Sequence, residues 1–320
     1  MARKSKGGAK RTKVEITPAD YRFPGETNLY VGGFIAITIL FVWIVAMFLI
    51  FKKTAAQTMQ WQWVYLFLWP LGSIWLASFL SARKRQAQIK KAGRSARVMT
   101  NNNPGLFSIL SQQASFFGFK KVPALYVLDD DAVFIYSLPG NPGSVLTSRK
   151  LVNELTQEEF SALLARELAS LRARNVRLGL AITWVRNANP LLKILCLPVF
   201  LLSIFTGAWI DITDYTADRG AVLATGSEAL LNLALVKQLI AQDPQAEISQ
   251  ADLEAFLQGT DGLFADSAQL ERQFKVGTFM ESQRQLKERI EQIGEYRQSD
   301  QGKRAFEKVA QIRGEAPRPA

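Results

Sequence analysis

The chain has 320 residues, of which 48% are hydrophobic and 21% are charged, and its formal net charge is +11. It contains no histidine, which excludes His-based triads, His general bases and His metal ligands. Its one cysteine, Cys196, excludes an intramolecular disulfide, which fits a reducing compartment.

Two long uncharged segments come first in chain order. Residues 31–51 and 62–82 carry no charged side chain. At ~1.5 Å per helical residue, each is long enough to cross a hydrocarbon core of ~30 Å. The sequence therefore predicts a transmembrane hairpin over residues 31–82, preceded by a basic N-terminal segment over residues 1–30.

Basic residues flank this hairpin on its outer sides. The flank after the second segment has no acidic residue and contains Arg83, Lys84, Arg85, Lys90, Lys91, Arg94 and Arg97, whereas the loop between the segments carries only Lys52 and Lys53. The positive-inside rule places both flanks in the cytoplasm. The seven side chains are candidates for binding anionic lipid headgroups. Because the flanks explain most of the net charge, we expect no nucleic-acid partner.

A third apolar stretch covers residues 178–210 and includes Arg186 and Lys193. A single crossing here would put the rest of the chain outside the cytoplasm, and the stretch is short for two full spans. Two interpretations stay open, a re-entrant or interfacial hairpin and a pair of short spans. In both, the two termini are cytoplasmic.

The segments after the hairpin predict a mainly α fold with a small antiparallel β-sheet. Three β-prone runs cover residues 124–128, 132–137 and 144–149. A capping box formed by Thr156 and Glu159 then opens an amphipathic helix over residues 157–174. Two further helices follow residue 210, separated at Gly226 and Ser227, and residues 244–320 form a C-terminal helical region with a disordered end.

Three short motifs lie in this part of the chain in a fixed order. They read LTQEE from Leu155 to Glu159, RELAS from Arg166 to Ser170, and DYTAD from Asp214 to Asp218. Their order and spacing resemble the HtpX-like membrane metallopeptidases, relatives of the CAAX prenyl peptidases, which carry LTxxE, HExxH and E-[FY]-x-A-D. The resemblance covers roughly residues 30–240. It implies a gluzincin-type, metallopeptidase-like domain over residues 83–243, anchored by two or more transmembrane helices.

The residues at the family's metal positions have changed. The resemblance puts Arg166 and Ser170 where the family has its two zinc-binding histidines, and Asp214 where it has a glutamate ligand. Glu167 keeps the general-base position and Asp218 keeps the last position of the third motif. A guanidinium is a permanent cation and cannot bind a metal ion. The resemblance therefore implies a site with no metal and no cofactor, in which Arg166 faces Asp214.

Two other chemistries stay open for these residues. Asp214, Glu167 and Asp218 could gather around a hard cation, although Arg166 in their midst opposes this. Ser170 or Cys196 could serve as a nucleophile, with Lys193 as a base for the serine, but no histidine can activate either one. The favoured interpretation is an ion-paired remnant of a peptidase site.

These observations predict a catalytically inactive pseudopeptidase in the membrane. Because the family works in membrane-protein quality control, the resemblance implies other membrane proteins or a protease complex as partners, besides the lipid bilayer. It also implies the bacterial inner membrane as the location. Two alternatives remain, a residual or non-zinc membrane-associated peptidase and a scaffold that uses the C-terminal helices.

Overall fold

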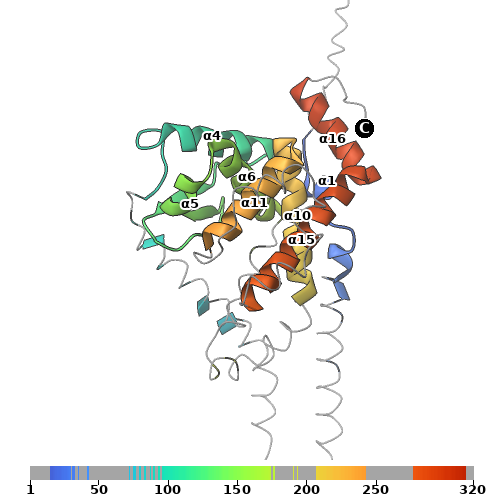
Figure 1. Ribbon diagram of the computed structural model, residues 1–320, viewed down its shortest axis with the longest axis horizontal. Helices are drawn as coiled ribbons and strands as arrows, with labels where there is room; N and C mark the ends of the chain where they lie inside the picture. Colours follow the sequence, from blue (N-terminus) through green and yellow to red (C-terminus); the bar gives the residue numbers. More distant parts are fainter. Residues whose placement is uncertain are drawn as a thin grey trace, which may run out of the picture.

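The structure is a computed structural model that describes residues 15–29, 96–173, 207–242 and 277–314, with isolated residues between 31 and 93 and residues 176, 190 and 193. Its elements are α1 (Pro18–Tyr21), α4 (Pro104–Phe116), β1 (Ala124–Leu128), β2 (Ile135–Leu138), β3 (Ser144–Ser148), α5 (Arg149–Glu154), α6 (Gln157–Ala173), α10 (Gly207–Thr225), α11 (Glu228–Gln242), α15 (Gly277–Gln298) and α16 (Asp300–Arg313). The described part is mainly helical with one small sheet, as the sequence predicts (Figure 1).

The sheet is mixed, which corrects the prediction of an antiparallel sheet. Its strand order is β1-β3-β2. β2 and β3 are antiparallel, with Ser137 opposite Val145, but β1 and β3 are parallel, with Leu125 opposite Val145. The prediction was wrong because β-propensity identifies an extended segment and not its partner. Residues 129–134 carry the chain past β1, so that β3 becomes the central strand.

The predicted capping box is present at the start of α6. The backbone N–H of Thr156 donates to Glu159 Oε2 at 2.8 Å, and the backbone N–H of Glu159 donates to Thr156 Oγ1 at 3.3 Å. This reciprocal pair satisfies backbone donors that a helix start leaves free. Glu159 also pairs with Lys237 of α11 at 2.7 Å, so the first turn of α6 is fixed against α11.

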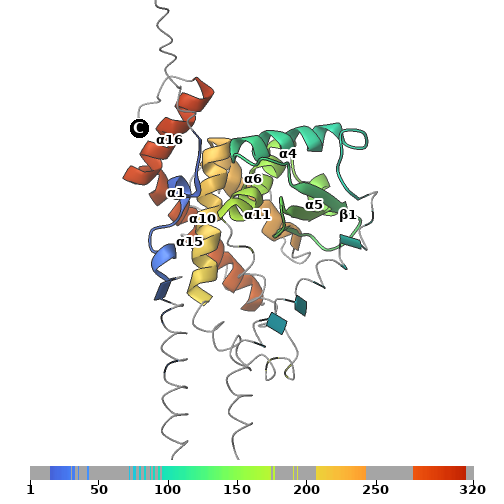
Figure 2. The same ribbon diagram turned by 180° about the vertical axis from the view of Figure 1, so that it is seen from behind.

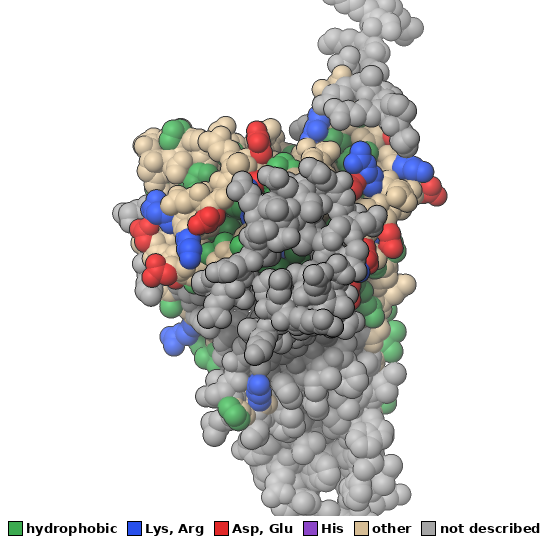
Figure 3. All heavy atoms as spheres, in the orientation of Figure 1, with side chains coloured by type: hydrophobic (Ala, Val, Ile, Leu, Met, Phe, Trp, Pro, Cys, Tyr) green, Lys and Arg blue, Asp and Glu red, His purple; other side chains and the backbone are tan. Residues whose placement is uncertain are grey.

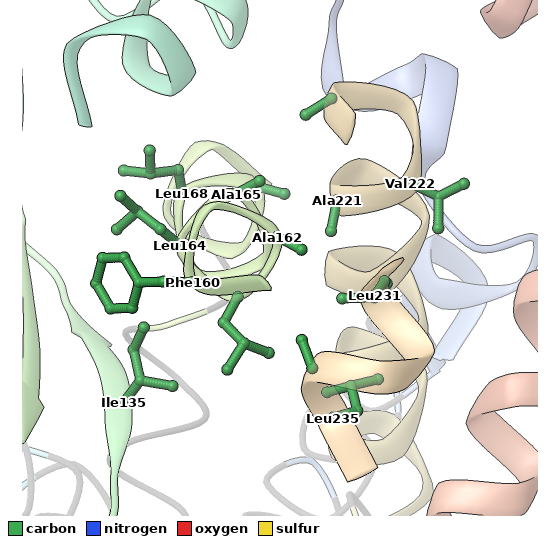
Figure 4. Packing of buried hydrophobic residues seen from close by; sticks show 14 of the residues in the cluster. Ile135, Phe160, Ala162, Leu164, Ala165, Leu168, Ala221, Val222, Leu231 and Leu235 are labelled. Carbon is green, nitrogen blue, oxygen red and sulfur yellow. The ribbon is translucent and has the colours of Figure 1, made fainter. Parts of the chain in front are cut away.

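α6 lies in the middle of the hydrophobic core. Figure 4 views it end-on, with Phe160 and Leu164 directed toward the sheet side and Ala162 and Ala165 directed toward Ala221 of α10. All five side chains are buried. Large side chains fill the wide gap to the sheet, while small ones allow α10 to come close to α6.

The approach of α10 to α6 requires a glycine. A Cβ placed on Gly220 of α10 would lie 2.4 Å from the Cβ of Ala169 on α6, a distance that no pair of carbon atoms tolerates without movement. The predicted break after α10 is confirmed at Gly226 and Ser227, and Gly226 has a φ of +75°. α10 is therefore held tightly along the helix that carries Arg166.

The C-terminal helices pack on the same core as α6 and α10. Figures 1 and 2 show α15 beside α10, and α16 beside α1, from opposite sides. Ile293 and Tyr296 of α15 and Ala305 of α16 are all buried. The N-terminal segment and the C-terminal helices, far apart in sequence, therefore lie next to each other.

The predicted transmembrane segments lie outside the described residues apart from isolated positions, and so does most of the stretch 178–210. Within the parts of the chain that the structure describes, no helix is both long and apolar enough to cross a membrane. Some isolated positions carry exposed apolar side chains, namely Val31, Ile35, Val42, Trp75 and Phe79.

Candidate functional site

Two helices bring the residues of the second and third motifs together. Arg166 and Glu167 lie on α6, while Asp214 and Asp218 lie one turn apart on α10. Residues at i and i+4 share a helix face, so both aspartates can reach the same point on α6. The resemblance-based prediction that Arg166 faces Asp214 is confirmed by this geometry.

Arg166 contacts a different carboxylate with each of its three guanidinium nitrogens. Its Nε donates to Asp218 Oδ1 at 2.9 Å, its Nη1 to Glu167 Oε1 at 2.8 Å, and its Nη2 to Asp214 Oδ1 at 2.7 Å. The Arg166 side chain is only 13% exposed. A planar fork of donors suits several carboxylates at once, so Arg166 occupies the centre of the site.

The three carboxylates differ in their burial. The Asp218 side chain is fully buried and that of Glu167 is 7% exposed, whereas that of Asp214 is 46% exposed. The site is therefore open to solvent on the Asp214 side. A fully buried carboxylate needs strong partners because desolvation is costly, and Asp218 has two of them.

The second partner of Asp218 is Arg289 on α15. Arg289 Nε donates to Asp218 Oδ2 and Arg289 Nη2 donates to Asp218 Oδ1, each at 2.7 Å. Arg289 was not among the residues predicted from the sequence. The available signal was its position on the stripe of apolar residues that faces the core, between Leu286 and Ile293, where an isolated arginine needs a buried acid.

The pKa values of the buried groups follow from these contacts. Burial raises the pKa of Glu167, and it outweighs the opposing effects of Arg166 and of hydrogen bonds from Ser137. Burial would also raise the pKa of Asp218, but the two guanidiniums of Arg289 and Arg166 overcome it and hold the pKa below its usual value. The acids around Arg166 outweigh its desolvation and raise its pKa. Arg166 and Asp218 are therefore charged at neutral pH.

Of the remaining sequence-predicted residues that the structure describes, Ser170, Arg83, Lys90 and Arg97 lie outside this cluster. Ser170 lies one turn beyond Arg166 on α6 and is half-buried. Of the lipid-headgroup candidates, Arg83, Lys90 and Arg97 are exposed, and Arg83 lies over the ring of Phe79 at 5.3 Å. Five predicted residues fall outside the described part of the chain, namely Lys84, Arg85, Lys91, Arg94 and Cys196.

A zinc ion of the kind that HtpX-like metallopeptidases bind does not fit these residues. Zinc needs lone pairs from deprotonated or neutral ligands. The first ligand position instead holds Arg166, which has no lone pair to offer and repels a cation. Asp214 Oδ1 already accepts a hydrogen bond from Arg166 Nη2. The same argument excludes a hard cation among Asp214, Glu167 and Asp218 while Arg166 lies between them.

Comparisons with known proteins agree with the motif-based resemblance. Two proteins, from two strains of Bacteroides fragilis and each called a protease HtpX homolog, are 24% identical to this chain. Each match covers 70% of this chain and 83% of the relative. No family model and no solved structure matches the chain. The matches support a relationship to the HtpX-like proteases.

Proposed function

We propose that this distant relative of the HtpX-like proteases is a catalytically inactive pseudopeptidase of the membrane. It acts as a binding, scaffold or regulatory subunit in membrane-protein quality control or in another membrane complex. The observation that carries the proposal is the position of Arg166, whose three donors take up Glu167, Asp214 and Asp218.

The ion pairs explain how a former peptidase site remains folded without its metal. Three carboxylates gathered at a partly buried site repel one another, and some would be driven to take up protons. Arg166 and Arg289 supply two positive charges within hydrogen-bonding distance of them. The cluster therefore keeps the charge balance that the fold needs, and it gives up the Lewis acid that peptide hydrolysis on the HExxH plan requires.

Membrane location is part of the proposal. It is supported by the uncharged segments 31–51 and 62–82 and their basic flanks. The exposed side chains of Ile35, Val42 and Trp75 are suited to contact with lipid. We propose the bacterial inner membrane, with both termini in the cytoplasm.

The proposed partners are the lipid bilayer and other membrane proteins or a protease complex, with no nucleic acid. On the face that Figure 3 shows, acidic and basic side chains of the described residues are interspersed. A nucleic-acid surface would instead gather basic side chains in a stripe or patch. The basic excess lies in the flanks of the predicted membrane segments, where lipid headgroups attract it.

A residual or non-zinc peptidase is the second candidate. Two observations favour it: Glu167 keeps the general-base position with a raised pKa, and Asp214 is 46% exposed. In the structure, however, Glu167 Oε1 accepts a hydrogen bond from Arg166. The base is thereby held by a cation.

A peptidase assay on the purified full chain in detergent separates the two candidates. We expect cleavage of unfolded membrane-protein substrates no faster than in the blank. Glu167→Gln should leave that result unchanged, and so should the matched control Glu158→Gln, which alters an exposed acid in the first turn of α6. Turnover that Glu167→Gln abolishes and Glu158→Gln preserves would overturn the proposal.

A further inference from the structure

The N-terminal segment immediately before the first predicted span is held by the C-terminal helices. The Tyr296 hydroxyl of α15 donates to the Asp20 carbonyl oxygen at 2.8 Å. Gln301 Nε2 of α16 donates to the carbonyl oxygens of Ala19 and Arg22 at 3.0 and 2.9 Å, and Lys308 pairs with the Asp20 carboxylate. α15 and α16 therefore make several of the polar contacts of residues 15–29.

The other side of the same segment rests on α6 and α10. Tyr21 is fully buried, and its hydroxyl donates to the Ala169 carbonyl oxygen at 3.3 Å. The backbone N–H of Phe23 donates to Thr216 Oγ1 at 3.0 Å. The segment is thus enclosed between the two helices of the candidate site and the two C-terminal helices.

Arg219 lies where these parts meet. Its guanidinium carbon is 4.4 Å from the ring centroid of Phe23 and 4.8 Å from that of Tyr296. Arg219 is 5% exposed, and its Nε and Nη1 have no hydrogen-bond partner among the described residues. Desolvation lowers its pKa to about 10, so it is still a cation at neutral pH. Aromatic faces stabilise a desolvated cation of this kind.

Arg219 directly follows Asp218, and α15 contacts both residues. Arg289 binds Asp218, and Tyr296 covers Arg219. These two α15 residues are seven positions apart, so they lie two turns apart on one helix face. A rigid α15 that moves away from Asp218 therefore also uncovers Arg219, which contacts the ring of Phe23.

We propose that residues 15–29, α15 and α16 form a clasp around Arg219 that couples the ion-paired site to the segment from which the first predicted span begins. The Arg289–Asp218 pair and the Phe23–Arg219–Tyr296 stack open and close together. A partner that displaces α15 thus changes the hold on the juxtamembrane segment. This coupling does not depend on whether the chain cleaves peptides.

Amide hydrogen exchange on the full chain in detergent tests the clasp. Arg289→Ala removes the contact between α15 and Asp218 of α10. It leaves every residue from 15 to 29 unchanged in sequence. We expect exchange in residues 16–23 to become roughly tenfold faster, which corresponds to about 1.4 kcal/mol. Arg289→Lys should give a smaller increase, because a lysine cannot make the bidentate pair.

The matched control is Lys287→Ala, two residues away on the exposed face of α15, where the Lys287 side chain is 48% exposed and lies 4.0 Å from Glu291. It should leave exchange in residues 16–23 unchanged. Strand β3 serves as the internal reference and should stay protected in every variant. The proposal is overturned if Arg289→Ala leaves residues 16–23 as protected as in the wild type, or if Lys287→Ala matches its effect. It is also overturned if β3 loses as much protection as residues 16–23, because the Arg289–Asp218 pair would then stabilise the whole fold.

Discussion

Arg166 is a largely buried guanidinium surrounded by acidic side chains. Its three donors each meet a carboxylate, and two of those carboxylates are almost completely buried. The attraction within such a cluster largely offsets the cost of taking the charges out of water. Removing one partner is nevertheless destabilising, because it leaves the other charges buried without an opposite charge.

Arg166→Ala should therefore lower the free energy of unfolding by roughly 3–5 kcal/mol, the typical cost of breaking a buried pair. Chemical denaturation in detergent measures this. The matched control is Arg149→Ala, because Arg149 also pairs with an aspartate, Asp129, but both side chains are exposed. That variant should cost less than about 1 kcal/mol. Equal effects of the two substitutions would contradict a buried ion-paired site.

The pKa of Asp218 predicts how stability depends on pH. The pKa of Asp218 is lowered in the folded state. Its contribution to the free energy of unfolding is therefore fully present above the pKa of about 3.9 in the unfolded state, and it is lost as the pH falls through the pKa of the folded state. Glu167 has a raised pKa and acts in the opposite sense, since it costs stability as the pH rises above about 4.3.

Unfolding midpoints of the wild type should therefore fall on acidification below a pH of about 4. In Asp218→Asn the midpoint should be lower at neutral pH, and the fall on acidification should be shallower. Thermal unfolding at a series of pH values measures both. An acid fall in Asp218→Asn as steep as in the wild type would assign the acid sensitivity to other carboxylates.

At this scale the sequence, read with the family resemblance, named four of the five residues of the cluster, all but Arg289. The spacing of RELAS fixes Arg166 and Ser170 on one face of α6, and the family resemblance supplied Asp214 as its neighbour. Arg289 was not predicted because it reaches Asp218 across 71 positions of sequence, from a segment that carries no recognised motif. Only its place on the apolar side of α15 hinted at a buried acid.

Among the helices, α6 and α10 are in close contact where Gly220 lies against Ala169. Gly220→Ala should cost about 1–3 kcal/mol, since overpacking forces helices apart, and it should also loosen the Arg166–Asp214 contact. Ala169→Gly in the same chain should restore much of the loss by vacating the space. Failure of this second substitution to rescue would show that the helices do not meet there.

Gly294 provides the matched control within α15. Among the described residues, a Cβ on Gly294 would meet no atom within 4 Å, and alanine is favoured over glycine inside a helix. Gly294→Ala should therefore stabilise the protein by about 0.5–1 kcal/mol. Denaturation curves of the two glycine variants should shift in opposite directions.

The sequence predicted where the helices and strands lie along the chain, but it did not predict how the strands pair. The capping box located the start of α6, and Gly226 located the end of α10, because both signals are local. The parallel pairing of β1 with β3 depends on a connection over residues 129–134 and on burial of β3 from both neighbours. Nothing in the three short strands themselves encodes that choice.

At the scale of the whole molecule, the basic flanks predict the arrangement of the chain in the membrane. Reporter fusions at the N-terminus and the C-terminus should both report the cytoplasm, because lysine and arginine are retained on that side. The clasp between residues 15–29 and the C-terminal helices also requires both parts on one side of the membrane. A C-terminal fusion found outside would contradict both arguments.

We propose that the guanidinium of Arg166 has replaced the metal of HtpX-like metallopeptidases. Elemental analysis of the full chain, purified from membranes without chelator and without added metal, tests this most directly. We predict no stoichiometric zinc and no change in the unfolding midpoint when a chelator is added, because Arg166 already bridges the three carboxylates. One tightly held zinc ion per chain, released only by chelator and with a loss of stability, would contradict the account.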